Sequence, residues 1–172
     1  MSRRAGSPHS IGVEPIAGLL DRRMGGASVY PFQPPGLWQA AFNGERTWKE
    51  SQGEDRYRRG LYVFLRRTVP YPSMTVFDSP SRETCTPRRI RTNTPLQALV
   101  TLNDPVYVEA AQALARRMVA ESGEDARMRV ERGLWLCLTR PPDARRVAVL
   151  EALAQQLTHL GVEALAGPAD LA

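Results

Sequence analysis

The sequence has few of the side chains that bind metals or form disulfides. Its 172 residues include two cysteines, Cys85 and Cys137, and two histidines, His9 and His159. The cysteines form no CxxC pair, and no CxxCH haem-attachment motif occurs. Because the usual nitrogen and sulfur ligands are so few and far apart in sequence, we expect no metal site and no cofactor in this chain. We expect two free thiols, with Cys85 in a polar linker and Cys137 buried in the apolar run LWLCL.

Membrane spans, export signals and catalytic motifs are also missing from the sequence. No apolar run has the length of a transmembrane helix, and no apolar h-region follows the basic start MSRRAGSPHSIGVEP. The motifs GxSxG, HExxH, GxGxxG and the phosphate-binding P-loop do not occur. A cysteine paired with His159 stays open as a dyad. Glu54, Asp55, Asp78 and Asp104 fit helix starts and turns better than catalytic pairs, so no catalytic residue is named.

Positive charge is abundant, and almost all of it is arginine. Lys49 is the single lysine among 23 basic residues, and the net charge is +5. Residues 1–92 carry 15 basic and 8 acidic residues (+7), whereas residues 93–172 carry 8 and 10 (−2). The densest arginines, interleaved with aromatic residues, are Arg56, Arg58, Arg59, Arg66, Arg67, Arg82, Arg88, Arg89 and Arg91. They indicate either an anion-binding surface or a helix face neutralised by carboxylates, and both interpretations stay open.

The first half is rich in proline, glycine and aromatic residues and predicts an irregular segment. Residues 16–24 have a short helical pattern that Gly25 and Gly26 end. The aromatic residues expected to pack on a core are Tyr30, Phe32, Trp38, Phe42 and Trp48. From residue 55 the apolar spacing predicts a helix that Pro70 and Pro72 end, followed by a linker anchored by Val76 and Phe77.

The second half has regular helical periodicity. It predicts helices over 105–121, 124–139 and from Asp143 to Gly161, separated by Gly123 and by a Pro–Pro pair. Short connections of this kind favour antiparallel neighbours. The predicted fold class is therefore mainly α, a small helical bundle in the C-terminal half preceded by the irregular segment.

The stretch RTNTPLQALVTLNDP predicts a joint between two helices. Thr94 fits as the cap of a helix that Pro95 opens, with Leu99 on a buried apolar face between helices. Asp104 then caps a second helix that Pro105 opens.

The same stretch resembles a known family. The run from GEDRYRRGLYVF to AAQALARRM, the preceding GGASVYPFQPPGLWQAAFNGERTW and the tail LCLTRPPDARRVAVLEAL are similar to the planctomycete PSD-type domain of unknown function. The resemblance covers about residues 18–160, leaving 1–17 as a divergent or disordered N-terminus and 161–172 as a tail. The residues that carry the hallmark are Thr92, Asn93, Thr94, Pro95, Leu96, Gln97, Leu102, Asn103, Asp104 and Pro105.

The resemblance implies a C-terminal module of larger secreted proteins, often joined to a planctomycete cytochrome C domain. It implies an extracytoplasmic setting, an association with polysaccharide and sulfatase systems, and haem c in an upstream domain rather than here. Since that upstream part does not precede this chain, we expect a fragment whose missing portion is one partner.

Three functions follow as hypotheses. The first is a non-catalytic binding or assembly module that works with acidic or sulfated polysaccharide. The second is part of a hydrolytic or redox enzyme whose active site lies partly upstream. The third is a basic nucleic-acid-binding protein, although no nucleic-acid-binding motif accompanies the charge.

Arg88, Arg89, Arg91 and Thr94 form the candidate anion site. The three arginines directly precede the helix start at Thr94, where free backbone N–H groups favour anions. The alternative is that Asp78, Glu83 or Asp104 neutralises these arginines within the fold.

Overall fold

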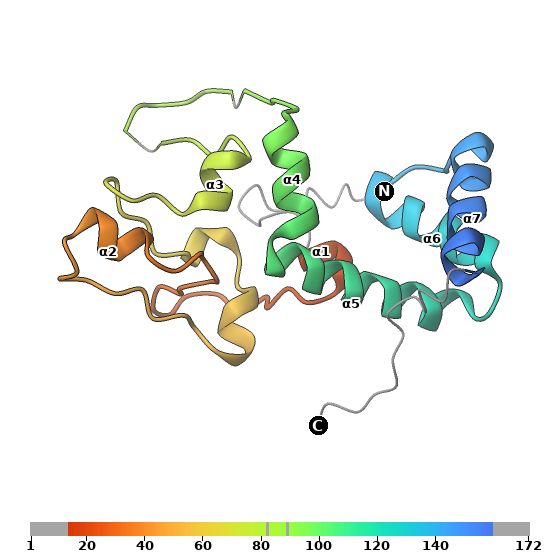
Figure 1. The fold of residues 1–172 in the computed structure, drawn as a ribbon, viewed down its shortest axis with the longest axis horizontal. Helices are drawn as coiled ribbons and strands as arrows, with labels where there is room; N and C mark the ends of the chain where they lie inside the picture. The colour runs from red at the N-terminus through yellow and green to blue at the C-terminus, as the bar shows by residue number, and fades with distance from the viewer. Residues whose placement is uncertain (1–13, 82, 89, 160–172) are drawn as a thin grey trace. The chain divides into compact units, whose positions relative to one another are not determined.

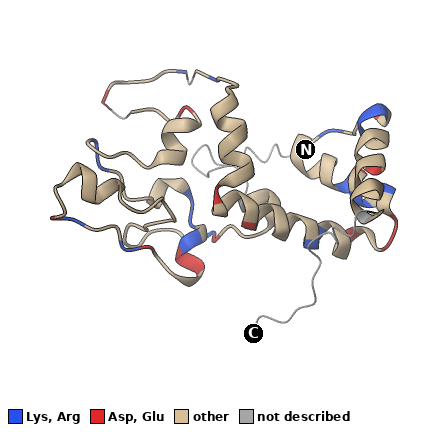
Figure 2. Ribbon diagram, in the orientation of Figure 1, with Lys and Arg blue, Asp and Glu red and all other residues tan. Residues whose placement is uncertain are grey.

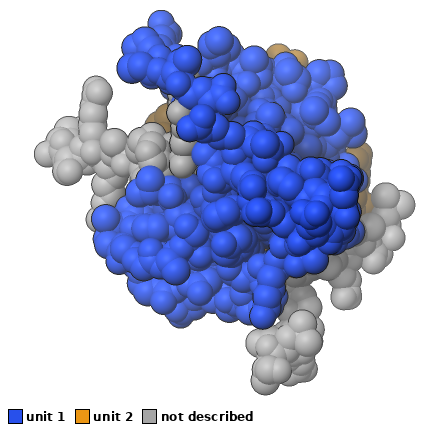
Figure 3. Space-filling model, turned by 90° about the vertical axis from the view of Figure 1, so that its left-hand side faces the viewer, with its two compact units in different colours: residues 1–15, 19–108 blue, residues 16–18, 109–172 orange. Residues whose placement is uncertain are grey.

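The structure is a computed structural model, and it describes residues 14–81, 83–88 and 90–159 of the chain. The chain divides into two compact units, which Figure 3 colours separately. Unit 1 comprises residues 1–15 and 19–108, and unit 2 comprises residues 16–18 and 109–172. The predicted N-terminus 1–17 and tail 161–172 lie almost wholly outside the described residues.

The helices confirm the predicted fold class, which is mainly α (Figure 1). Across the described part of the chain, pairing between extended segments is limited to three isolated bridges. The elements are α1 (Glu14–Ala17), α2 (Leu37–Ala41), two 3₁₀ turns (Gly53–Tyr57 and Gly60–Tyr62), α3 (Pro72–Val76), α4 (Pro95–Asn103), α5 (Pro105–Ser122), α6 (Ala126–Leu138) and α7 (Ala144–His159). Among these helices, none is both long and apolar enough to cross a membrane.

Unit 1 has a small core covered by aromatic rings. Val29, Val63 and Tyr71 are buried, and Trp48 packs against them. The ring of Tyr30 stacks on Phe64 at a centroid distance of 5.1 Å and meets Trp48 edge-on at 5.0 Å. The expectation that aromatic residues of the Pro/Gly-rich segment pack inward is therefore confirmed.

The helix predicted from residue 55 to Pro70 is wrong. Two 3₁₀ turns occupy that stretch, and the chain around them pairs with an earlier extended segment. Val29 N donates to Tyr62 O at 2.8 Å, and Phe64 N donates to Val29 O at 2.9 Å. Gly60 lowers helix propensity, and the aromatic and β-branched side chains around it gain burial by pairing. Pro72 opens α3 instead of ending a helix.

The helix predicted over residues 16–24 is also mostly wrong. α1 ends at Ala17, and Gly18 has a positive φ of 85°. Such a left-handed residue ends a helix readily.

Unit 2 contains the C-terminal helices, whose limits the sequence predicts to within a few residues. α5 ends at Ser122, and Gly123 follows with φ 66°. Asp125 caps α6 through Arg127 N at 2.8 Å, and Asp143 Oδ1 accepts from Arg145 N at 2.8 Å at the start of α7. The predicted end of the last helix at Gly161 lies outside the described residues.

Close helix packing in unit 2 depends on small residues. Ala110, Ala113 and Val147 are buried, and a Cβ added to Gly133 would lie 2.7 Å from Met118 Cε. α5 and α6 thus approach each other where Gly133 leaves room for the Met118 side chain, and α6 packs on α7.

Candidate functional site

The hallmark stretch forms a network that fixes the start of α4. Thr94 caps the helix: its hydroxyl accepts from Gln97 N at 3.3 Å, while Gln97 Oε1 accepts from Thr94 N at 3.1 Å. This reciprocal arrangement is a capping box, which satisfies two backbone donors that a helix start leaves open. The prediction that Thr94 caps the helix is confirmed.

Gln97 also ties α4 to α3. Its amide nitrogen donates to Val76 O and to Thr92 Oγ1, both at 2.9 Å. Thr92 in turn binds Asp78, with the backbone N–H 2.8 Å from Oδ2 and the hydroxyl 2.8 Å from the same oxygen. We call Val76, Asp78, Thr92, Thr94 and Gln97 the clasp.

The prediction that Leu99 is buried is wrong. Leu96, Leu99 and Leu102 are 56%, 58% and 74% exposed, whereas Gln97 is 8% exposed. The helix turns its amide inward because the clasp offers Gln97 several hydrogen-bond partners, which offset the cost of removing the amide from water.

We therefore expect Leu99→Ala to change the free energy of unfolding by less than about 1 kcal/mol, because little apolar surface returns to water. Urea denaturation measures this. A loss of several kcal/mol would show that Leu99 packs against another part of the protein.

The other end of α4 follows the sequence prediction. Asn103 Nδ2 donates to Leu99 O at 2.8 Å, and Asp104 Oδ1 accepts from Val106 N at 2.9 Å. Pro105 is the first residue of α5. The side chains of Asn103 and Asp104 therefore serve the backbone at the turn between α4 and α5.

The clasp closes a loop of residues 79–91. Asp78 lies two residues after the end of α3 and has a positive φ of 57°, and Thr92 lies just before α4. The hydrogen bonds between Thr92 and Asp78 therefore join the two ends of the loop. Apart from residues 82 and 89, which lie outside the described residues, Figure 1 shows this segment as an extended trace between α3 and α4, and Figure 2 shows basic positions along it. A loop with joined ends is typical of surface loops that carry function.

Two of the predicted site arginines are available on this loop. Arg88 and Arg91 are exposed, and neither forms an ion pair with a carboxylate of the described residues. Glu83 is exposed on the same loop, and the Asp104 carboxylate accepts from Val106 N. Arg89 lies outside the described residues, as does Arg82.

Thr94 is less available than the two arginines to bind an anion. Its hydroxyl oxygen and its backbone N–H are both used in the capping box. Pro95 has no N–H, so little of this helix start is left for an anion. The site prediction thus depends on the arginines of the loop.

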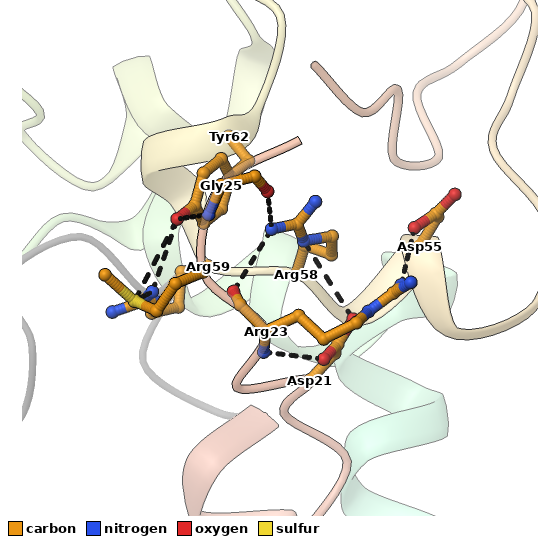
Figure 4. Close-up of polar contacts among 8 residues, drawn as sticks. Asp21, Arg23, Gly25, Asp55, Arg58, Arg59 and Tyr62 are labelled. Carbon is orange, nitrogen blue, oxygen red and sulfur yellow. Dashed lines mark hydrogen bonds and ion pairs between the residues drawn. The ribbon is translucent and has the colours of Figure 1, made fainter. Parts of the chain in front are cut away.

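Most other arginines of the basic cluster serve the fold. Arg58 is 7% exposed, and its Nη2 donates to Arg23 O at 3.1 Å and to Gly25 O at 2.6 Å (Figure 4). Its guanidinium lies 3.9 Å from the centroid of the Tyr62 ring. Arg58 therefore holds the Gly25–Gly26 turn, a role that no local pattern in the sequence indicates.

Asp21 completes this network. Its Oδ1 accepts from Arg23 N at 2.8 Å, its Oδ2 lies 2.7 Å from Arg23 Nε, and Arg23 Nη2 reaches Asp55 at 2.8 Å. The hydrogen bond from the Arg23 backbone, followed by those of the arginine side chain, lowers the pKa of Asp21. In unit 2, hydrogen bonds from Arg117 and then Arg132 lower the pKa of Glu121.

Lowered carboxyl pKa values fix the direction of the acid response. Asp21 and Glu121 contribute stability above the ordinary pKa of an unfolded carboxyl, about 4, and this contribution is lost as the pH falls through the folded value. We expect the melting temperature of the wild type to decrease when the pH is lowered below about 4. The decrease should be less steep in the double variant Asp21→Asn/Glu121→Gln. An equally steep decline in the double variant would contradict this assignment.

The cysteines are free thiols, as expected, but Cys137 is exposed, so its predicted burial is wrong. Partial burial of the thiol nonetheless raises the pKa of Cys137. We therefore expect both cysteines of the folded protein to react with iodoacetamide without denaturant. The alkylation rate of Cys137 should rise markedly as the pH is raised, because the thiolate is the reactive form. Peptide mass spectrometry measures the two rates, and protection of Cys137 until unfolding would contradict the exposed position.

The fold and its clasp define the class of protein: a helical domain in which a capped helix fixes an arginine-bearing loop. Within the described residues, no three His, Cys, Asp or Glu side chains gather as metal ligands would. The sequence model of the family described as PSD1, protein of unknown function (DUF1553), matches residues 13–154. The chain belongs to this family. No curated protein and no solved structure matches the chain.

Proposed function

We propose that this chain is a non-catalytic binding or assembly module that captures an acidic or sulfated polysaccharide through the loop of residues 79–91. The observation that carries the proposal is the contrast among the arginines. Arg58 and Arg23 are engaged by acceptors within the fold, whereas Arg88 and Arg91 are exposed on a loop whose ends the clasp holds. Guanidinium groups bind sulfate and carboxylate through paired N–H donors, so this loop suits such a ligand.

The proposal also gives the hallmark a role. The clasp residues bind one another, and their hydrogen bonds hold the loop ends together. A loop with fixed ends loses less conformational freedom on binding than an open one, which favours affinity. The extracytoplasmic setting and the link to polysaccharide processing belong to this proposal and derive from the family resemblance.

Calorimetry tests the proposal with the full 172-residue chain and a defined sulfated polysaccharide such as dextran sulfate. We expect binding at about 20 mM salt that weakens roughly tenfold or more at about 200 mM, because counterions are released on binding. Arg88→Ala/Arg91→Ala should abolish most of this binding without changing the melting temperature.

The matched control is Arg140→Ala/Arg146→Ala in unit 2, which removes the same charge from other exposed positions. If this control loses binding equally, the polymer responds to net charge and not to the loop. Dextran of the same length, without sulfate, should not bind. A titration with duplex DNA tests the alternative that the chain binds nucleic acid. That alternative predicts tighter binding of DNA than of the sulfated polymer.

A further inference from the structure

We propose that Met24 is an oxidation site, and that Arg59 and Tyr62 receive the oxygen of its sulfoxide. Met24 precedes the Gly25–Gly26 turn and is 74% exposed, so a dissolved peroxide reaches its sulfur. Its thioether sulfur lies against Arg59 Nη2 and 4.0 Å from the Tyr62 hydroxyl. This site is independent of the loop of residues 79–91.

The surroundings of the sulfur have an excess of hydrogen-bond donors. The Tyr62 oxygen accepts from Gly25 N at 2.7 Å and lies 3.4 Å from Arg59 Nη2, so its own proton is left to donate to the Met24 sulfur. Arg59 Nε is buried and has no hydrogen-bond partner among the described residues. A guanidinium offers only donors, and a thioether sulfur is a weak acceptor. Arg59 Nη2 and the Tyr62 hydroxyl therefore share a weak acceptor, the Met24 sulfur, where a strong acceptor would bind both donors better.

A sulfoxide oxygen supplies such an acceptor. The sulfur of Met24 attacks one oxygen of hydrogen peroxide, an S–O bond forms and the O–O bond breaks. The departing hydroxide takes the proton of the attacked oxygen, through solvent, and leaves as water. The sulfur loses two electrons and the peroxide gains them. The new S=O group can accept from Arg59 Nη2 and from the Tyr62 hydroxyl, which ties the turn to the 3₁₀ segment.

The test uses the full chain with Met128→Leu, since Met128 is the other strongly exposed methionine of the described residues, at 54%. After mild hydrogen peroxide treatment, peptide mass spectrometry should show the added oxygen on Met24. The melting temperature of this oxidised protein should rise by about 2 °C, the shift expected for one added hydrogen bond in a chain of this size. Met24→Leu in the same background, treated in parallel, removes any contribution from other sites.

Two variants identify the receiving groups. In Arg59→Ala and in Tyr62→Phe the oxidation of Met24 should still occur, but the rise in melting temperature should be reduced or lost. Tyr62→Phe keeps the ring that packs on the core and therefore serves if Arg59→Ala does not fold. A wild-type sulfoxide that melts at or below the temperature of the reduced protein overturns the proposal. So does an undiminished rise in both variants.

Discussion

Replacing Gln97 with leucine should lower the free energy of unfolding of unit 1 by about 2–4 kcal/mol. The leucine fills a similar volume but leaves Thr94 N and Val76 O without the partners that Gln97 provides. The two hydrogen bonds are part-buried. A shielded backbone group left unpaired costs about 1–3 kcal/mol, and the two effects overlap because the groups share one network.

Urea denaturation followed by the fluorescence of Trp38 and Trp48, in a Trp135→Phe background, reports on unit 1 alone. Gln156→Leu on the exposed surface of α7 is the matched control and should change the free energy of unfolding by less than about 0.5 kcal/mol. Wild-type stability of Gln97→Leu would mean that the clasp is not what holds α4.

Arg58→Met should be as damaging, with an expected loss of about 2–4 kcal/mol in the free energy of unfolding. The variant keeps a long apolar stem but removes the donors to Arg23 O and Gly25 O and the cation that stacks on Tyr62. Arg58→Lys should restore little, since a lysine lacks the planar fork that serves both carbonyls.

The same fluorescence assay measures the Arg58 variants. Arg67→Met is the control, because Arg67 is exposed and forms no ion pair within the described residues. Equal stability of Arg58→Met and Arg67→Met would show that the buried arginine is dispensable.

The parts of the fold that were predictable are those with local signals. The capping residues Thr94, Asp104 and Asp143 and the breaker Gly123 each act within a few positions of where they stand, so α4 to α7 follow from the sequence. Local hydrogen bonds and backbone conformation decide these boundaries.

The parts that were missed depend on contacts distant in sequence. The apolar residues between positions 55 and 69 recur at helical spacing. The extended segment around Val29 nonetheless pairs with this stretch, and the pairing takes the place of a helix. The burial of Gln97 depends on Val76, 21 residues earlier, and that of Arg58 on carbonyl groups more than 30 residues earlier. An apolar period on α4 predicts buried leucines, whereas the hydrogen-bond partners of one amide decide which face turns inward.

The candidate site was predictable in part. The arginine density and its position before a helix start are visible in the sequence, and Arg88 and Arg91 are exposed as an anion site requires. The sequence alone does not separate these two from Arg58, which has the same side chain but is committed to the fold.

The central claim is that the hallmark clasp holds the loop while Arg88 and Arg91 bind the ligand. The most direct measurement is the affinity of the chain for dextran sulfate at low salt, determined together with the melting temperature, for the wild type, Thr92→Val and Arg88→Ala/Arg91→Ala. We predict that the arginine variant loses binding at an unchanged melting temperature, and that Thr92→Val melts lower and binds more weakly while keeping both arginines. Undiminished binding by the arginine variant would contradict the claim.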